Sequence, residues 1–253
     1  MARRRENTIR NRKNELKKQD FQRKKADKFT IPDVIIACED SVSSPTYFKM
    51  IIQDLMNKRI ITYDSFVIAN YKHSNPSGVL KDLENHKCDN GKTYKNFDHK
   101  WIVIDRDSER VGGGGHTAED FNNALRAAEK LKVNVAYSND SFELWYLLHF
   151  NYRETAILRD ILLTQIIEKL KAKNQSKFSK LDKDTIKQKE YTQLIFNEIL
   201  ELQETAIKNA ETLLLSYEDS HNPEKDNPST TVHKLVKILN SLGKKEEEEQ
   251  IEE

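Results

Sequence analysis

Residues Trp101–Asp107 read WIVIDRD, an apolar run that ends in two carboxylates separated by one residue. The apolar run predicts a buried strand, because strands of a parallel sheet are covered on both faces. Asp105 and Asp107 follow at its carboxyl end, where open α/β sheets bind their ligands. A second run of the same design, Val34–Cys38 (VIIAC), is followed by Glu39. We therefore predict that two buried strands deliver acids to one edge of one sheet.

The rest of the first half of the chain alternates between strand and helix patterns. Short apolar runs over residues 66–69 and 133–137 predict two further strands, and the second of these is the last strand that the pattern shows. Segments with apolar residues at helical spacing separate the runs, at residues 43–56, 77–84 and 117–131. This alternation predicts an α/β fold with a parallel-rich sheet, right-handed crossovers and flanking helices.

From residue 142 onward the pattern is helical. It predicts a dense apolar helix over residues 142–150, a helix over 154–172 and a long helix over 186–217. Ser229 or Thr230 is the expected N-cap of a last helix that ends near Gly243. We divide the chain into four parts: a basic N-terminal arm (1–30), an α/β core (31–150), a helical C-terminal part (151–243) and an acidic tail (244–253).

The composition limits the environment of the protein. Among 253 residues, 42 Lys and Arg stand against 41 Asp and Glu, so the molecule as a whole is not a polycation. No apolar run approaches the roughly 20 residues that a membrane helix needs, and the N-terminus lacks the apolar centre of a signal peptide. The two cysteines have no C-x-x-C spacing, which argues against a zinc knuckle or a disulfide framework. We expect a cytoplasmic protein without a membrane partner.

The two ends of the chain carry opposite charge. Met1–Lys28 contains twelve Lys and Arg residues and four acids, whereas residues 244–253 are mostly Glu. The basic arm has two open interpretations: contact with the phosphate backbone of nucleic acid, or a solvated helix without a partner. The tail is interpreted as a solubilising segment. The candidate nucleic-acid contacts are arginines near the start of the arm: Arg3, Arg4, Arg5, Arg10 and Arg12.

The acids after the two strands are candidate metal ligands. Taken alone, Asp105 and Asp107 have a plain interpretation as polar loop residues after a strand. Glu39 in the equivalent position after another strand favours a site, because three acids at one edge repel one another unless a cation is bound. Mg²⁺ fits best, with Mn²⁺ as an alternative, because no His or Cys belongs to the cluster and Mg²⁺ takes carboxylate oxygens.

Two more acids follow the fourth predicted strand. Either Asp140 or Glu143 has a structural interpretation as the cap of the next helix, where the helix dipole favours an acid. Either is also placed to complete a second metal site, with Glu143 the better candidate. Gly112–Gly115 does not match a Walker A loop, because no Lys-Ser/Thr pair follows, and it is interpreted as a linker, with a flexible lid as the alternative. His116, the next residue, is interpreted as an exposed side chain.

Together these segments resemble the RloB-like family of bacterial defence proteins, whose core looks like a Toprim domain. The resemblance spans nearly the whole chain, and its Phe-Glu-Leu-Trp to His-Phe segment is specific. Asp40 departs from the pattern, because the family usually has Gly there; it adds charge beside the site and a stiffer backbone. The segments that carry the resemblance are Arg3–Arg5, Val34–Glu39, Pro45–Phe48, Ile104–Asp107, Ser138–Asn139, Phe142–Trp145, Leu148–Phe150, Asn227–Thr230 and Val232–Val236.

The resemblance implies a fold and an activity. A Toprim-like domain implies a mostly parallel sheet, Glu39 as general acid/base or metal ligand, and Asp105 and Asp107 as ligands of Mg²⁺. Glu143 would add a further oxygen ligand about 4 Å from the first ion if cleavage uses two metals. The family is similar to nuclease effectors of abortive phage defence, often encoded beside an ATPase partner. The resemblance thus implies a Mg²⁺-dependent nuclease.

Substrate and partners stay open at this point. The resemblance does not distinguish RNA, such as tRNA, from DNA. The alternative to a nuclease is a catalytically inactive Toprim-like module that binds nucleic acid or an ATPase partner and serves as a sensor. The sequence also leaves a homodimer open.

Overall fold

A computed structural model of the chain describes residues 31–62, 65–108 and 114–242. The basic arm, with its five candidate arginines, and the acidic tail lie outside the described residues. The described fold belongs to one unit, residues 32–242. None of the described helices combines the length and the apolar character that a membrane span requires.

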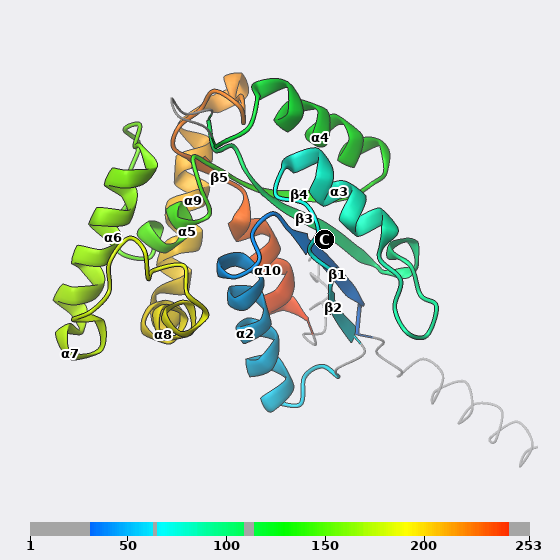
Figure 1. Ribbon diagram of the computed structural model, residues 1–253, viewed down its shortest axis with the longest axis horizontal. Helices are drawn as coiled ribbons and strands as arrows, with labels where there is room; N and C mark the ends of the chain where they lie inside the picture. Colours follow the sequence, from blue (N-terminus) through cyan, green and yellow to red (C-terminus); the bar gives the residue numbers. More distant parts are fainter. Residues whose placement is uncertain (1–30, 63–64, 109–113, 243–253) are drawn as a thin grey trace, which may run out of the picture. The chain divides into compact units, whose positions relative to one another are not determined.

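A five-stranded sheet lies at the centre of this unit, in the order β2-β1-β3-β4-β5 (Figure 1). β1, β2, β3 and β4 run parallel, and β5 runs antiparallel to β4. The predicted α/β class with a mostly parallel sheet and flanking helices is confirmed. The strands span these residues: β1 Val34–Cys38, β2 Phe66–Ile68, β3 His99–Asp105, β4 Asn134–Asn139 and β5 Ser229–Thr230.

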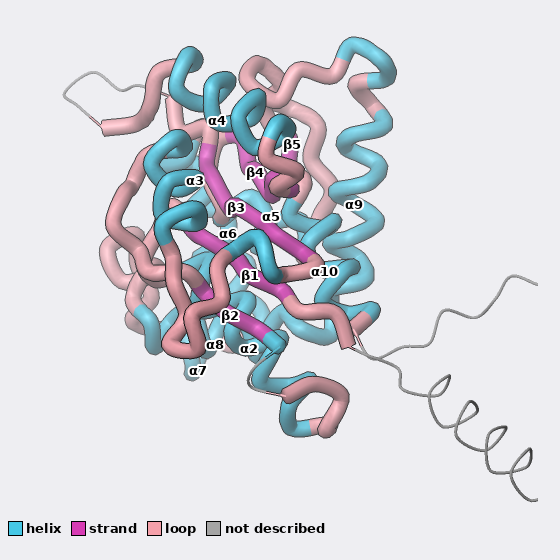
Figure 2. Tube along the Cα trace, turned by 90° about the vertical axis from the view of Figure 1, so that its right-hand side faces the viewer, coloured by secondary structure: helices cyan, strands magenta, loops and turns pink. Residues whose placement is uncertain are grey.

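Helices cover both faces of the sheet (Figures 1 and 2). α3 (Pro76–Asn85) and α4 (Ala118–Lys130) lie on one face, and α2 (Ser43–Asn57) and α10 (Val232–Ser241) lie on the other. Because both faces are covered, every residue of β1 is buried, which explains its unbroken apolar run. The core under α3 and α4 is built from apolar side chains of the sheet and the two helices, among them Ile35, Ala37, Val79, Leu83, Ile102, Ile104, Phe121 and Ala124.

The helical C-terminal part packs against α2 and the end of the sheet. Its centre is the buried ring of Tyr47 on α2, whose centroid lies 5.9 Å from that of Phe142 and 5.1 Å from that of Phe196. The Tyr47 hydroxyl also accepts a hydrogen bond from Gln203 Nε2 at 3.2 Å. The helices of this part that precede α10 are α6 Arg159–Lys173, α7 Gln175–Phe178, α8 Lys189–Ile199 and α9 Gln203–Leu215, and α5 Glu143–Leu148 is the last helix of the α/β core.

The sheet extends one strand further than predicted. Ser229 and Thr230 form β5 beside β4, so their interpretation as the N-cap of the last helix was wrong. α10 begins at Val232 instead. Thr230 is fully buried, and its hydroxyl donates to the Tyr137 carbonyl oxygen at 2.8 Å. The same hydroxyl lies 3.0 Å from the Ser138 hydroxyl. A strand of two polar residues carries no alternating pattern, so no local sequence signal marks it.

Two predicted helices also have different bounds. The long helix predicted over residues 186–217 is two helices, α8 and α9, separated by a 3-10 turn at Leu200–Leu202. No Gly or Pro marks this break, so local sequence could not predict it. Gln203, the first residue of α9, is held from outside the helix by Tyr47 and by Asn240, whose Nδ2 donates to Gln203 Oε1 at 2.6 Å. The helix predicted over 154–172 begins only at Arg159.

The start of α2 is stabilised by Asp40, two residues before its N-cap. Asp40 Oδ1 accepts a hydrogen bond from the Val42 backbone N–H at 2.8 Å, and Oδ2 accepts one from the Ser44 backbone N–H at 3.1 Å. The Ser44 hydroxyl also donates to this carboxylate. These bonds satisfy backbone donors that the first turn of a helix leaves without partners. Asp40 therefore has a structural task at the start of this helix.

The buried histidine His149 makes the stability of the fold depend on pH. It is 1% exposed, its Nδ1 lies 2.7 Å from the Trp145 carbonyl oxygen, and burial lowers its pKa from 6.5 to about 4. Between these two values the unfolded chain binds a proton at this residue that the folded chain does not bind. The free energy of unfolding should therefore decrease as pH falls through this window, by up to about 3 kcal/mol from this group.

Urea denaturation of wild type and His149→Asn at several pH values checks this prediction. Asn is neutral at every pH, so the free energy of unfolding of the variant should depend less on pH than that of wild type. Each protein is compared with its own stability at neutral pH. Some slope should remain, because burial also lowers the pKa of His233 to about 4. If the two proteins lose stability equally on acidification, His149 is not the group responsible.

Candidate active site

The carboxyl ends of β1 and β3 bring two of the predicted acids into contact. Glu39 directly follows β1, and Asp105 is the last residue of β3. Because β1 and β3 are neighbours in parallel register, the Asp105 backbone N–H donates to Glu39 Oε2 at 2.9 Å. Glu39 is only 9% exposed. Its backbone N–H donates to the Val103 carbonyl oxygen at 2.9 Å and so continues the hydrogen bonding between β1 and β3. The predicted convergence of these two acids is present in the structure.

The end of β4 runs beside the residues that come after β3. The Asp107 N–H donates to the Asp140 carbonyl oxygen at 2.9 Å, and the Ser108 N–H donates to Asp140 Oδ1 at 3.1 Å. Asp140 therefore fastens the loop after β3 through its backbone and its side chain. Its interpretation as the cap of the next helix was wrong, since the residue before α5 is Phe142 and no side chain caps that helix. Asp107, 9% exposed, lies at the same edge.

Glu143 is the first residue of α5 and is almost fully buried, at 1% exposure. Among the described residues, neither of its carboxylate oxygens accepts a well-formed hydrogen bond, and the Lys187 ammonium lies 3.1 Å from Oε1. Burial raises the pKa of Glu143, but Lys187 and Arg159 lower it by more, so the net pKa is below the ordinary value. Glu143 is therefore a buried, ionised carboxylate.

Asp105 experiences the charge of the whole cluster. Burial raises its pKa well above the ordinary value, and the carboxylates of Glu39 and Glu143 raise it further. Burial also raises the pKa of Glu39. Contact with His116 lowers this pKa in part, and the charge of Asp107 raises it further. These shifts mean that the ionised forms repel one another in a poorly solvated place. A bound cation would remove that repulsion and restore ionisation at both residues.

His116 contacts the acid cluster, so its interpretation as an exposed side chain was wrong. Its Nε2 is in hydrogen-bonding contact with Glu39 Oε1, and its side chain is 13% exposed. The hydrogen bond to Glu39 raises the pKa of His116. Its backbone N–H donates to the Asp107 carbonyl oxygen at 2.7 Å. One histidine thus contacts both the acid after β1 and the acid after β3.

Gly115 holds His116 in this position. Gly115 has a φ of +82°, a backbone conformation that residues with a side chain rarely adopt. A Cβ atom at this position would lie 2.6 Å from the Asp107 carbonyl oxygen and closer still to the Ser108 carbonyl oxygen. The residue must therefore be Gly for both conformation and space. The described end of the Gly112–Gly115 segment is thus packed against the acid motif. The glycine run was the one signal in the sequence that pointed to this close approach.

Two basic side chains from the helical part reach the acids. Arg159, the first residue of α6, donates from Nη1 to Asp107 Oδ2 at 3.0 Å, and Lys187, in the loop before α8, pairs with Glu143. Burial lowers the pKa of Arg159, but Glu143 and Asp107 raise it by more. Sequence reasoning missed both cations, because each lies far along the chain from the acid that it contacts.

The arginine between the two aspartates is held by a third segment. Arg106 is 7% exposed, and its Nη2 donates to Glu224 Oε1 at 2.7 Å. Its Nη1 donates to the His116 carbonyl oxygen at 3.2 Å. Asn139, at the end of β4, donates from Nδ2 to the Glu224 carbonyl oxygen at 3.2 Å. The middle residue of the acid motif is thereby fixed to the loop before β5 and to the residue that contacts Glu39.

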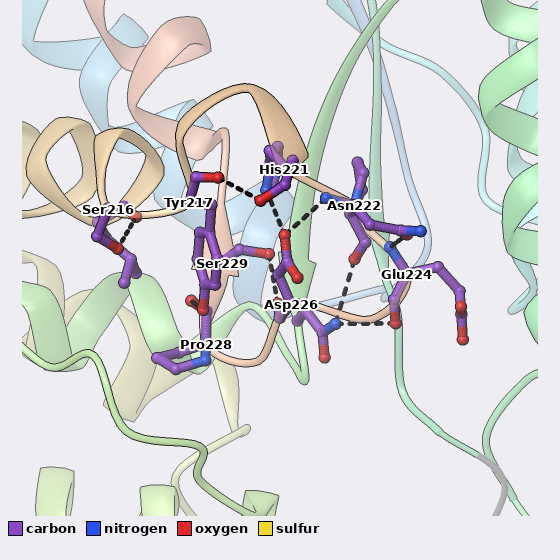
Figure 3. A network of polar contacts seen from close by, with 12 residues as sticks. Ser216, Tyr217, His221, Asn222, Glu224, Asp226, Pro228 and Ser229 are labelled. Atoms are coloured by element: carbon purple, nitrogen blue, oxygen red, sulfur yellow. Dashed lines mark hydrogen bonds and ion pairs between the residues drawn. The ribbon is translucent and has the colours of Figure 1, made fainter.

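A network of polar contacts fixes the loop that carries Glu224 (Figure 3). His221 lies between Asp226, whose Oδ2 is 2.7 Å from Nδ1, and the hydroxyl of Tyr137 on β4, which contacts Nε2. Asp226 Oδ2 also accepts from the Asn222 backbone N–H at 2.6 Å. Since Tyr137 belongs to the sheet, this network fastens the loop to the strand that ends at the acid cluster.

The carboxylates have the donor atoms that a hard divalent cation requires. All are oxygen donors, which Mg²⁺ prefers, and burial raises the pKa of Asp105, with a further contribution from the charges of Glu39 and Glu143. In residues 31–62, 65–108 and 114–242, however, no group of three or more His, Cys, Asp or Glu side chains is spaced to hold a metal ion. Three acids instead contact a basic side chain each: Glu39 contacts His116, Asp107 contacts Arg159 and Glu143 contacts Lys187. Cation binding therefore requires these side chains to turn from their basic partners.

Comparison with known proteins identifies one family. A family model described as RloB-like protein matches residues 34–239. The matched range begins at the first residue of β1 and ends within α10, so it includes both the sheet and the helical part. No curated protein and no solved structure matches the chain.

The close approach at Gly115 gives a test of the site's construction. Gly115→Ala should lower the free energy of unfolding by about 3 kcal/mol. Of this, about 1 kcal/mol reflects the left-handed conformation and about 2 kcal/mol the clash with two backbone carbonyls. Gly91→Ala is the matched control, because Gly91 has a φ of +78° but nothing lies within 4 Å of an added Cβ. It should lose only the conformational part, about 1 kcal/mol.

Chemical denaturation of wild type and the two variants measures the loss of unfolding free energy caused by each substitution. Equal destabilisation by the two substitutions would contradict the packing of Gly115 against the acid motif.

Proposed function

The chain belongs to the RloB-like family, and we propose that it is a Mg²⁺-dependent phosphodiesterase that cuts nucleic acid. The observation that carries the proposal is the set of carboxylates at the carboxyl edge of the sheet, where burial raises the pKa of Asp105 and the charges of Glu39 and Glu143 raise it further. Like charges are brought together there at a cost in stability that a divalent cation would relieve. Mn²⁺ is the alternative metal, since its ligand preference is the same.

Each acid has a role in this proposal. Asp105 and Asp107 would hold the first cation, and Glu143, with Asp140 next to it, would provide oxygens for a second. When bound, Mg²⁺ supplies charge neutralisation at the scissile phosphate and a more acidic bound water. Glu39 is the general acid/base: its raised pKa brings it nearer to neutral pH, where a group can both accept and release a proton.

His116 is a positioning residue for Glu39. It holds Oε1 while the Asp105 N–H holds Oε2, so both carboxylate oxygens have a fixed direction. Arg106 in turn fixes the carbonyl group of His116. The general acid/base is therefore oriented from two sides before substrate arrives, which is what precise proton transfer requires.

Family resemblance supports a biological setting. It favours an effector of abortive anti-phage defence that acts on RNA, such as tRNA, or on DNA, together with an ATPase partner. The basic arm would add sequence-independent contacts with phosphates.

A second candidate function is a catalytically inactive module that binds nucleic acid or an ATPase partner as a sensor. The observation that favours it is the pairing of three acids with basic side chains of the same chain, at Glu39, Asp107 and Glu143. In such a module these pairs would be permanent, and no metal would compete for the acids.

Substitution of the acids distinguishes the two functions. Asp105→Asn should reduce Mg²⁺-dependent cleavage of RNA or DNA by at least about a hundredfold, because it removes a metal ligand. Its melting temperature should equal or exceed that of wild type, because the substitution removes a carboxylate that burial and two like charges disfavour. Asp107→Asn should be equally inactive but slightly less stable, since it weakens the contact with Arg159.

Glu143→Gln should also lower cleavage by orders of magnitude while the fold is kept, because Gln fills the same volume. Asp54→Asn is the control, since this acid lies exposed on α2 in a pair with Lys58. Cleavage should be measured on nucleic acid extracted from cells that express each protein and on purified substrates. Full cleavage by the folded Asp105 variant would refute the metal site. Absence of metal-dependent cleavage in wild type, alone or with its genomic neighbour, would favour the inactive module.

A further inference from the structure

The segment around Arg159 combines charge with exposed apolar surface. Among the described residues, six large hydrophobic side chains are exposed, and three of them fall at Tyr152, Leu158 and Ile161. Their exposed fractions are 37%, 69% and 50%. Leu158 and Ile161 are three residues apart at the start of α6, so they share one side of the helix. Exposed apolar side chains next to a cation that contacts the acid cluster make this segment a candidate binding surface.

This segment is fixed in place. The Ile157 N–H donates to Asn227 Oδ1 at 3.0 Å, and Asn227 Nδ2 donates back to the Ile157 carbonyl oxygen at 3.2 Å. Arg153 donates from Nε to the Thr155 carbonyl oxygen at 2.9 Å. The exposed side chains therefore stand on an ordered backbone, and their exposure does not come from a loose loop.

The cations at the site are closer to solvent than the acids that they contact. The side chains of Arg159 and Lys187 are 19% and 35% exposed, whereas those of Asp107 and Glu143 are 12% and 1% exposed. Both cations are therefore accessible to an anionic ligand that approaches from solvent. Without them, the acids at this edge would repel a phosphate group.

We propose that residues 152–161 and Lys187 form a binding surface for a single strand of nucleic acid. Arg159 and Lys187 contact its phosphates, and the exposed side chains of Tyr152, Leu158 and Ile161 contact its bases. Sites for single strands combine cations that follow the backbone with aromatic side chains on which the unpaired bases stack. Tyr152 would provide such a ring, and Leu158 and Ile161 would add apolar contact with the bases. A duplex hides its bases and offers nothing to the apolar side chains. This inference rests on the proposed function and names its substrate as single-stranded.

The two cations change partner in this proposal. In the structure they neutralise Asp107 and Glu143. When those acids turn to a divalent cation, Arg159 and Lys187 become available to the phosphate beside it. A purely structural counter-ion would stay with its acid, so the two roles predict different effects on nucleic-acid affinity.

Fluorescence anisotropy with short single-stranded RNA and DNA oligonucleotides tests the surface, with Ca²⁺ in place of Mg²⁺. We expect Arg159→Met and Lys187→Met each to weaken binding about tenfold and to reduce the slope of log affinity against log salt by roughly 0.7, as loss of one phosphate contact requires. Leu158→Ser should weaken binding by roughly fivefold without a change of slope, because it removes an uncharged base contact. The matching duplexes should bind wild type more weakly than either single strand.

Each variant has a matched control elsewhere on the described surface. Lys177→Met removes a half-exposed lysine that pairs with Glu198 at 2.9 Å, and Leu215→Ser removes an apolar side chain that is 76% exposed. Both should bind as wild type does. Because Lys187→Met leaves Glu143 buried without its cation, the double variant with Glu143→Gln is compared with Glu143→Gln alone if the single variant does not fold.

The outcomes separate this surface from the proposed function. Unchanged affinity and salt slope in the Arg159 and Lys187 variants, with only their stability reduced, would show that both residues are counter-ions and would overturn the surface. Tighter binding of duplex than of single strand by wild type would also overturn it. In either case metal-dependent cleavage by wild type would leave the proposed function standing. A wild-type protein that neither binds nor cuts nucleic acid would refute both.

Discussion

Repulsion between carboxylates that lie close together at one edge of the sheet is the constraint on which this structure depends. Parallel pairing of β1 with β3 carries Glu39 and Asp105 to the same edge, and α5 adds Glu143. Burial raises the pKa of Asp105, and the charges of the two neighbouring acids raise it further. A fold that needed only stability would place well-packed apolar residues there. The concentration of charge is therefore the feature that a function must explain.

Other segments of the chain balance this charge. Arg106 comes from the acid motif itself, His116 follows the glycine run, and Arg159 and Lys187 come from the helical part. The helical part is thus a component of the site, since it supplies cations that the sheet does not. The loop before β5 completes the arrangement through Glu224, which holds Arg106.

Local pattern and parallel topology were enough to predict the four parallel strands of the sheet and the acids at its edge. Apolar runs identified β1 and β3, and the rule that parallel strands end at one edge placed Glu39 beside Asp105. Local pattern could not predict β5, because two buried polar residues depend on hydroxyl bonds made to β4. Nor could it predict the contacts of His116, Arg159 and Lys187 with the acids, since these join residues that only the tertiary fold brings together. Gly115 was a visible signal, and its meaning became clear only from the carbonyl groups that it approaches.

The central claim is that the carboxylates at this edge hold a divalent cation, and direct titration with Mn²⁺ tests it without reference to catalysis. Electron paramagnetic resonance detects free Mn²⁺, whose signal is lost on binding. We expect wild type to remove the signal of at least one Mn²⁺ per chain, added Mg²⁺ to restore it, and Asp105→Asn together with Asp107→Asn to abolish the binding. A free Mn²⁺ signal that rises in proportion to the added metal, with wild type as with buffer, would contradict the account.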